Sequence, residues 1–354
     1  MPTESASLSL LSIISLISFF VFLITNKLSD KIGNGILLDQ DFDKPQAFHK
    51  EPIGRSGGLA GIISLTIFFI LYYFLFKQIL IDYLFLSATM FFLGFSEDIK
   101  FKINPKYRLL LMIVLLSLFI FFFSINISGI DIDFLNSLMK INILSTFFIL
   151  LCFLFIINGA NLIDGFNGLL TIHLLIINII LLFINLNNGH HYLTMTITAQ
   201  IVVLISFLLF NFPKAKMFLG DSGSYLFGSL VALNIINTNN LNPNISSFFF
   251  CILLFYLFFE VFFSFFRKLY LRKSPLRPDE CHLHMLLYNF LENSRKFKDS
   301  NYLNSVIINL IYMCVILPAL FFNDNGFVCR YWFFSLLALY IVFYSLLYSF
   351  EKKQ

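Results

Sequence analysis

The sequence predicts an all-α, polytopic integral membrane protein with about eleven transmembrane helices. Hydrophobic residues make up 58% of the 354 residues and charged residues only 12%, which is about half the charged fraction of a soluble domain. Apolar runs long enough to cross a bilayer recur along the chain. Because a backbone in lipid must pair its own polar groups, we expect these runs to be helices. The composition excludes an ordinary globular protein.

The predicted helices follow one another without a long linker or an internal repeat, so residues 1–354 are expected to form a single domain. The first run lacks the basic region of a cleavable signal peptide and is expected to be retained. The third, fifth and eighth runs are short, and the eighth begins with polar residues. The predicted spans are 7–25, 56–76, 79–95, 108–126, 142–158, 169–186, 192–210, 222–238, 245–263, 303–322 and 331–349.

Lysine and arginine are distributed unevenly between the connections of these helices. All but three of the 24 basic residues follow odd-numbered helices, the exceptions being Lys77, Lys140 and Arg330. Since basic loops stay in the cytoplasm, we expect the N-terminus outside and the C-terminus inside. The net charge of +4 is too small to indicate nucleic acid as a partner. The predicted cytoplasmic loops that would carry the chemistry are 26–55, 96–108, 158–168, 211–224 and 264–302.

These loops contain nearly all the polar residues that could support chemistry. Charges at helix ends often only mark the membrane interface. Asp164, however, lies between two long apolar runs, where a carboxylate costs roughly 2.5–3.5 kcal/mol on insertion scales and is usually functional. Asp221 follows Gly220 and precedes Ser222-Gly223, and such neighbours let a ligand approach the backbone closely. The concentration of such residues on one face favours a functional site there.

The residue types indicate the kind of chemistry. Carboxylates on several loops, with basic residues and few histidines, suit a hard cation such as Mg²⁺ and a phosphorylated substrate. Phosphoryl transfer depends mainly on charge neutralisation and in-line positioning, and Lys and Arg hold diphosphate oxygens. Zinc is not expected, because the sequence has no Cys/His ligand set at usable spacing. A serine hydrolase is not expected either, because no nucleophile elbow is present.

Two motifs in these loops are the most specific. They stand at Asn158, Asn161 and Asp164-Gly165, and at Asn211, Pro213, Phe218, Gly220, Asp221, Gly223 and Ser224. With the other polar residues of the loops, in this order and on this side, they resemble the polyprenyl-phosphate N-acetylhexosamine-1-phosphate transferase superfamily over roughly residues 39–290. Three departures stand out: Glu97-Asp98 replaces a pair of aspartates, Asn167 replaces a second aspartate found in many members, and one histidine is missing from the segment 282–285. The Glu-Asp pair and the segment 260–284 are more similar to the O-antigen-initiating branch.

The resemblance implies a glycosyl-1-phosphate transferase in the bacterial cytoplasmic (inner) membrane, with its active site facing the cytoplasm. It would transfer N-acetylhexosamine-1-phosphate, or a related sugar-1-phosphate, from a UDP-sugar to undecaprenyl phosphate, giving undecaprenyl-diphospho-sugar and UMP. This step would initiate synthesis of a cell-surface polysaccharide such as lipopolysaccharide O-antigen. The implied cofactor is Mg²⁺, with Mn²⁺ as a substitute. The sequence identifies neither the sugar nor the oligomeric state, although a homodimer is compatible with it.

The expected site residues divide by role. Asp221 is the first choice for a metal ligand, and Glu97 is the second. Asp98 is expected to orient or deprotonate the lipid phosphate. Asp164 and His282 complete the expected catalytic set with Glu97. The expected substrate-binding residues are Lys44, His49, Arg55, Lys106, Arg108, Asn158, Asn161, Asn167, Asn211, Phe218, Gly220 and His284.

Three alternatives remain open at this point. One is the peptidoglycan enzyme that forms lipid I, a phospho-MurNAc-pentapeptide transferase. A transporter of a phosphorylated solute would usually show Gly- or Pro-interrupted helices in two related halves, and the sequence has no such symmetry. A membrane scaffold would have no reason to gather carboxylates, amides and histidines on one face.

Overall fold

The computed structural model describes residues 4–31, 35–40, 52–101, 103–275, 279–294 and 299–352. It confirms an all-α polytopic membrane protein, with one two-stranded antiparallel hairpin as the only sheet in the described ranges. The elements are α1 (Glu4–Leu28), β1 (Leu38–Asp39), β2 (Ile53–Gly54), α2 (Gly57–Phe76), α3 (Ile81–Asp98), α4 (Pro105–Phe122), α5 (Asp133–Met139), α6 (Asn142–Ile163), α7 (Leu169–Asn187), α8 (His191–Asn211), α9 (Gly220–Leu241), α10 (Ser247–Leu253), α11 (Phe255–Tyr270), α12 (Leu283–Asn293), α13 (Ser300–Leu320) and α14 (Gly326–Glu351).

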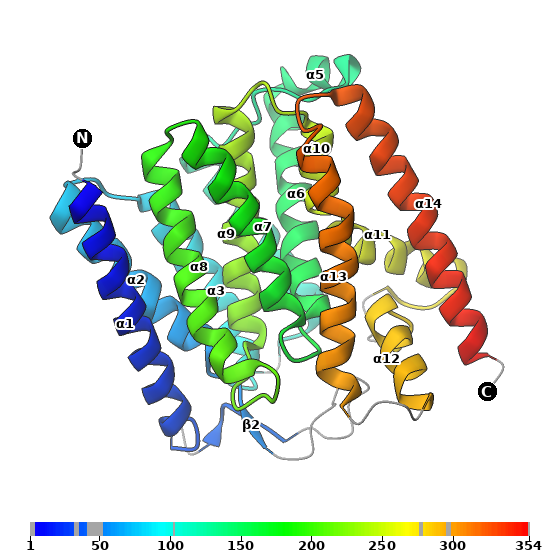
Figure 1. The fold of residues 1–354 in the computed structure, drawn as a ribbon, viewed down its shortest axis with the longest axis horizontal. Helices are drawn as coiled ribbons and strands as arrows, with labels where there is room; N and C mark the ends of the chain where they lie inside the picture. The colour runs from blue at the N-terminus through cyan, green and yellow to red at the C-terminus, as the bar shows by residue number, and fades with distance from the viewer. Residues whose placement is uncertain are drawn as a thin grey trace.

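The long helices run side by side and form a bundle with two distinct ends (Figure 1). The short helix α5 lies at one end, where α1 begins. Strand β2 and helix α12 lie at the other end, where α14 finishes. The outward faces of the helices expose large apolar side chains such as Phe121 and Leu339, as expected where the surrounding solvent is lipid.

Among the described residues, eight helices are long and apolar enough to span a membrane, or nine if α10 and α11 form one broken span. Two further predicted spans correspond to α3 and α9. Helix α3 carries three carboxylates, Asp82, Glu97 and Asp98, and α9 is rich in polar residues. Every predicted span thus has a helical counterpart, while the total of eleven crossings and the placement of the termini remain predictions.

The predicted span 245–263 is broken in the structure, because α10 and α11 meet at an angle of 74°. Beyond the break, α11 crosses α6 at Gly159, where an added Cβ would lie 2.2 Å from the carbonyl oxygen of Leu257. The missing side chain therefore allows the two backbones to touch. The change of direction carries Glu260 of α11 to the start of α12.

Helix α9 occupies the centre of the bundle and is buried along nearly its whole length. In its middle, the Asn234 amide donates to Asn178 of α7 and to Gln200 of α8, at 3.1 and 2.8 Å. The Tyr83 hydroxyl of α3 donates to the side-chain oxygen Oδ1 of Asn234 at 3.0 Å. These bonds satisfy polar groups that would find no water at membrane depth. Helix α9 is thus fixed by three neighbours, and its position determines where Asp221 lies.

Candidate active site

The N-terminus of α9 is the structural centre of the candidate site. The buried Asp98 carboxylate, at the end of α3, accepts hydrogen bonds from the backbone N–H groups of Asp221 and Ser222, at 3.0 and 2.9 Å. The first N–H groups of a helix have no partner within the helix, and the helix dipole favours negative charge there. Asp98 therefore caps α9, a role that the sequence did not predict, and holds Asp221 in the first turn.

Glycines make this approach of α3 to α9 possible. Gly220 has φ of +76°, and a Cβ there would lie 2.6 Å from Asp98 Oδ2. At Gly94, an added Cβ would lie 2.3 Å from the Asp221 carbonyl oxygen. Since real Cβ atoms do not sit so close to other heavy atoms, side chains at either position would push the two helices apart. Gly220 was expected to bind substrate; in the structure it leaves the space that the Asp98 carboxylate needs to reach α9.

The carboxylates of Glu97 and Asp221 both face the guanidinium group of Arg108. Arg108 Nη1 of α4 lies 3.3 Å from Glu97 Oε1 and 3.3 Å from Asp221 Oδ2, and all three side chains are about three-quarters buried. Glu97 and Asp221 therefore face a common position that can hold a positive charge. Among the described residues, no three His, Cys, Asp or Glu side chains converge into a complete metal site. Any divalent cation here would need further ligands from substrate or water.

Asp164 contributes a further carboxyl group to the same region. It is the C-cap of α6, directly after Ile163. Burial raises the pKa of its carboxyl group well above the usual value, and the charges of Asp221 and Asp98 raise it further. A crowded carboxylate resists ionisation until a cation compensates it. The structure therefore brings Asp164 together with the other predicted carboxylates.

Arg55 belongs to this charged region as well. Its Nη2 lies 2.6 Å from Asp39 Oδ2, across the β1–β2 hairpin. Burial lowers the pKa of the Arg55 guanidinium, but the pairing with Asp39 and the more distant charges of Asp221 and Asp98 outweigh it, so the net shift is upward. Arg55 is therefore a permanent positive charge beside the carboxylates. Asp39 was not predicted as a site residue, because nothing in a short polar stretch indicates its partner.

Phe218 is held by backbone bonds on both sides. Its N–H donates to the Gly54 carbonyl oxygen at 2.9 Å, and its own carbonyl oxygen accepts from the Gly57 N–H at 3.0 Å. The half-buried Phe218 is therefore held next to Gly54 and Gly57, the residues on either side of Arg55 in the sequence. Lys106 is exposed at the start of α4. Lys44 and His49 lie outside the described residues.

The predicted amide side chains make contacts within the protein. Asn211 accepts from the Gly168 N–H at 2.6 Å and donates to the Met217 carbonyl oxygen at 2.9 Å. Asn167 donates to the Pro213 carbonyl oxygen at 3.0 Å. Both residues join the loop after Asp164 to the loop before α9. Their first role is to fix these loops, which the motif alone did not reveal.

The other two predicted amides lie on α6. Asn161 donates to Ser224 Oγ at 3.1 Å, and that hydroxyl in turn donates to the Asp221 carbonyl oxygen at 3.2 Å. Asn158 donates to the Leu154 carbonyl oxygen in the preceding turn at 2.7 Å. Asn161 therefore joins the first turn of α9, whereas Asn158 bonds within its own helix.

The two histidines form a neighbouring buried group. His282 Nδ1 lies 3.1 Å from Glu260 Oε1, and its Nε2 lies 3.3 Å from Asp279 Oδ1. His284 Nδ1 lies 3.2 Å from the Tyr256 hydroxyl. Burial lowers the pKa of His284 to about 3, so its ring is neutral near neutral pH. Tyr256 was not predicted, because an aromatic residue in an apolar run carries no distinguishing signal.

Phe166 connects the histidines to the carboxylates. Its ring contacts His284 edge-on, with centroids 5.8 Å apart, and it lies two residues after Asp164. The predicted loop 158–168 therefore meets His284 of the predicted loop 264–302. No bond joins either histidine to Asp221 or Glu97 among the described contacts, so the predicted direct role of His282 in catalysis stays a prediction.

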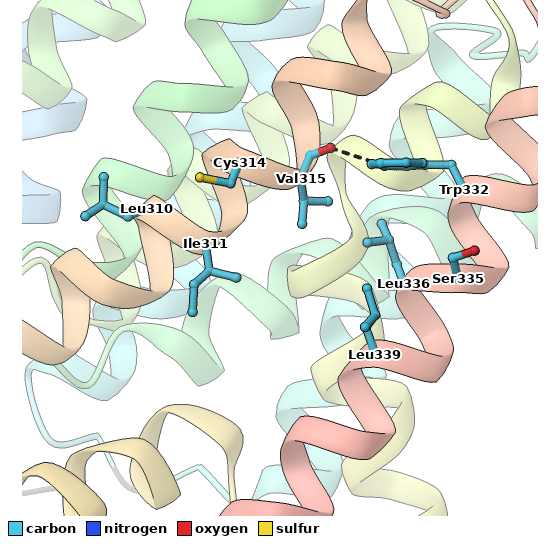
Figure 2. A pocket seen from close by; sticks show the side chains of 8 residues that line it. All are labelled: Leu310, Ile311, Cys314, Val315, Trp332, Ser335, Leu336 and Leu339. Atoms are coloured by element: carbon cyan, nitrogen blue, oxygen red, sulfur yellow. Dashed lines mark hydrogen bonds between the residues drawn. The ribbon is translucent and has the colours of Figure 1, made fainter.

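A separate groove lies between α13 and α14 (Figure 2). It has a volume of about 420 Å³ and runs from Leu310 to Leu339. On its rim, the Trp332 indole N–H donates to the Val315 carbonyl oxygen at 3.2 Å. Its lining includes no charged side chain, so it takes no part in the charged site.

Comparisons with known proteins agree with this arrangement. A model of the glycosyl transferase family 4 matches residues 80–239, which include Asp98, Asp164 and Asp221. An undecaprenyl-phosphate alpha-N-acetylglucosaminyl 1-phosphate transferase of Thermotoga maritima is 31% identical over 198 residues, 56% of this chain and 58% of that protein. A phospho-N-acetylmuramoyl-pentapeptide-transferase of Streptococcus sanguinis is 29% identical over 160 residues, 43% of this chain and 49% of that protein.

These matches span about half the length of the curated relatives. The family match covers the carboxylate centre, whereas α14 lies beyond it. The shared segment contains the predicted motifs and lies within the polytopic helical fold. Over residues 80–239 the chain is similar to glycosyl transferase family 4, and over about half of its length it is similar to the two transferases named above.

Proposed function

We propose that this protein transfers N-acetylhexosamine-1-phosphate from a UDP-sugar to undecaprenyl phosphate, releasing UMP. The observation that carries the proposal is the pair Glu97 and Asp221, which face one guanidinium nitrogen at 3.3 Å each at the start of α9. Asp164 adds a third carboxyl group to this region, and the charges of Asp221 and Asp98 raise its pKa. A site of this kind suits a cation and a diphosphate rather than an apolar or neutral substrate.

The residues present fit Mg²⁺, which is usually bound by one or two carboxylates together with substrate phosphates and water. Asp221 and Glu97 would hold it. When bound, Mg²⁺ would offset the negative charge of the UDP diphosphate as UMP leaves. Mn²⁺ would substitute, because oxygen sites of this kind accept both ions.

The protein's own residues would prepare the substrates around this position. Arg108 and Arg55 would neutralise phosphate oxygens, and the exposed Lys106 would assist at the mouth of the site. Phe218 would stack on the nucleotide base. Asp98 would keep the first turn of α9 in place. A phosphate monoester is already largely ionised near neutral pH, its second pKa being about 6, so the need for Asp98 as a base is weak.

The location follows from the basic loops. We propose that the charged site faces the cytoplasm of a bacterial inner membrane, with the N-terminus outside and the C-terminus inside. The basic residues after odd-numbered helices support this orientation. In the structure, α1 begins and α14 ends at opposite ends of the bundle, which is consistent with it (Figure 1).

The pathway is the finer part of the proposal. The Glu97-Asp98 pair favours initiation of a cell-surface polysaccharide of the O-antigen kind. The second candidate is a phospho-N-acetylmuramoyl-pentapeptide-transferase, because several relatives carry that name. A panel of UDP-sugars, including UDP-N-acetylglucosamine and UDP-MurNAc-pentapeptide, would distinguish the two.

The test is an assay of purified protein in detergent with labelled UDP-sugar, Mg²⁺ and undecaprenyl phosphate. We expect lipid-dependent release of UMP, lost on addition of EDTA. Asp221→Asn should lower the apparent affinity for Mg²⁺, whereas Asp133→Asn, on the exposed helix α5 at the other end of the bundle, should not. UMP release that needs neither lipid nor metal would contradict the proposal, and so would equal behaviour of the two variants.

A further inference from the structure

The C-terminal helix α14 lies beyond the family match, yet its inward face reaches the histidine loop, which we define as residues 279–282. Most of α14 exposes apolar side chains, and only a few of its residues are buried. Among these are Tyr340 and Tyr344, one turn apart, whose rings stack with centroids 6.3 Å apart. Two phenol hydroxyls therefore point from a largely lipid-exposed helix into the protein.

The first hydroxyl acts on His282 through Glu260. Tyr340 donates to Glu260 Oε2 at 2.5 Å, while Glu260 Oε1 accepts from the Leu283 N–H at 3.1 Å and faces His282 Nδ1 at 3.1 Å. An ionised carboxylate only accepts, so Nδ1 must carry the hydrogen in this contact. The remaining nitrogen, Nε2, is then directed toward Asp279.

The second hydroxyl acts on the loop backbone. Tyr344 donates to the Cys281 carbonyl oxygen at 3.1 Å and accepts from Arg267 Nη1 at 3.1 Å. Arg267 Nη2 binds both oxygens of Asp279, each at 3.0 Å. The histidine loop is therefore held at both ends by a tyrosine of α14 and a charged residue of α11.

We infer that Tyr340 and Tyr344 are positioning residues for the transferase reaction: through Glu260 and Arg267 they fix the histidine loop and the orientation of His282. This inference rests on the proposed function. A helix that only covered the bundle would need apolar contacts alone, and α14 could supply these with phenylalanine. Instead, the Tyr344 hydroxyl bonds to this loop at Cys281, and the Tyr340 hydroxyl bonds to Glu260, which contacts His282 of the loop.

Tyr340→Phe and Tyr344→Phe test the inference, because each removes one oxygen and keeps the ring. Tyr348→Phe is the matched control: its ring stacks on Tyr344 with centroids 5.9 Å apart, and its hydroxyl has no hydrogen bond among the described residues. We expect turnover in the UMP-release assay to fall about 10- to 100-fold in the two test variants, the range for a lost bond to a charged group. The affinity for UMP alone should not change.

Cys281 supplies a readout that does not depend on activity. Burial raises the pKa of its thiol, so it should react slowly with a maleimide in the intact protein. A released loop should open more often and raise the labelling rate on the order of tenfold in both test variants, but not in the control. The other cysteines are first replaced by serine; they are Cys152, Cys251, Cys314 and Cys329.

The outcomes separate this inference from the proposed function. Slower turnover together with faster labelling at unchanged thermal stability supports the positioning role. A change in only one of the two readouts, or in neither, overturns it. Should Tyr340→Phe not fold, Glu260→Gln tests the same contact. A wild-type protein that transfers no sugar phosphate, while labelling still responds to both tyrosines, would refute the function and leave the structural contact standing.

Discussion

Replacing Asp98 with asparagine tests whether this residue caps α9 or acts as a base. The carboxylate accepts two backbone hydrogen bonds, at 3.0 and 2.9 Å, and asparagine can accept only one of them. Losing one bond to a charged acceptor costs about 1.5–3 kcal/mol, and losing the charge at a helix N-terminus costs about 0.3–1 kcal/mol. We expect the free energy of unfolding to fall by about 2–4 kcal/mol.

The functional consequence should reach the neighbouring residue of α9. Because Asp98 binds the backbone N–H of Asp221, the variant should weaken apparent Mg²⁺ affinity by about tenfold, the scale of a lost supporting contact at a metal ligand. Thermal unfolding and Mg²⁺ titrations in detergent measure the two effects, with Asp133→Asn as the control. The capping role predicts a turnover defect that does not shrink as pH rises from 6 to 9. A defect that shrinks as pH rises, at unchanged stability, would refute it and support a base.

Further predictions concern the pKa of Asp164, the orientation of the chain in the membrane and the packing at Gly94. Burial and neighbouring charges raise the pKa of Asp164, so protons compete with the cation for this carboxyl group below that pKa. The Mg²⁺ affinity, measured by calorimetry, should therefore rise with pH from 6 to 9. Asp164→Asn should reduce this dependence of the affinity on pH. A cysteine at the exposed Asn188 should label from outside the cell and one at the exposed Lys214 should not; the reverse pattern would overturn the orientation. Gly94→Ala, whose Cβ would meet a backbone carbonyl at 2.3 Å, should cost about 1–3 kcal/mol of stability, whereas Gly129→Ala, with open space around it, should be neutral by thermal unfolding.

The sequence predicted those parts of the fold and site that depend on local pattern. The apolar runs predicted the helices, and the helical counterparts were found for all of them. Asp164 and Asp221 could be selected because a carboxylate at the end of an apolar run is costly. In the structure the charge of Asp221 contributes to the raised pKa of Asp164, whereas the roles of both residues remain predictions.

Other features depend on packing and could not be predicted. The capping role of Asp98 requires α3 to touch α9, which Gly94 permits. The break between α10 and α11 was missed because the predicted span 245–263 continues across it without a proline or glycine. Tyr340 lies 80 residues from Glu260, and no sequence pattern pairs residues at that distance. Sequence reasoning therefore identified the chemical groups but not the contacts that orient them.

The polar middle of α9 has a consequence for how the protein enters the membrane. Asn234 would leave its amide unpaired in lipid if α9 were inserted alone, and polar side chains at a helix centre oppose release from the translocon. Its partners Asn178 and Gln200 lie on α7 and α8, which are synthesised just before α9. We expect the translocon to retain α9 until these helices can receive it, so that the three enter the bilayer together and the end of α9 that carries Asp221 is put in place in the same event.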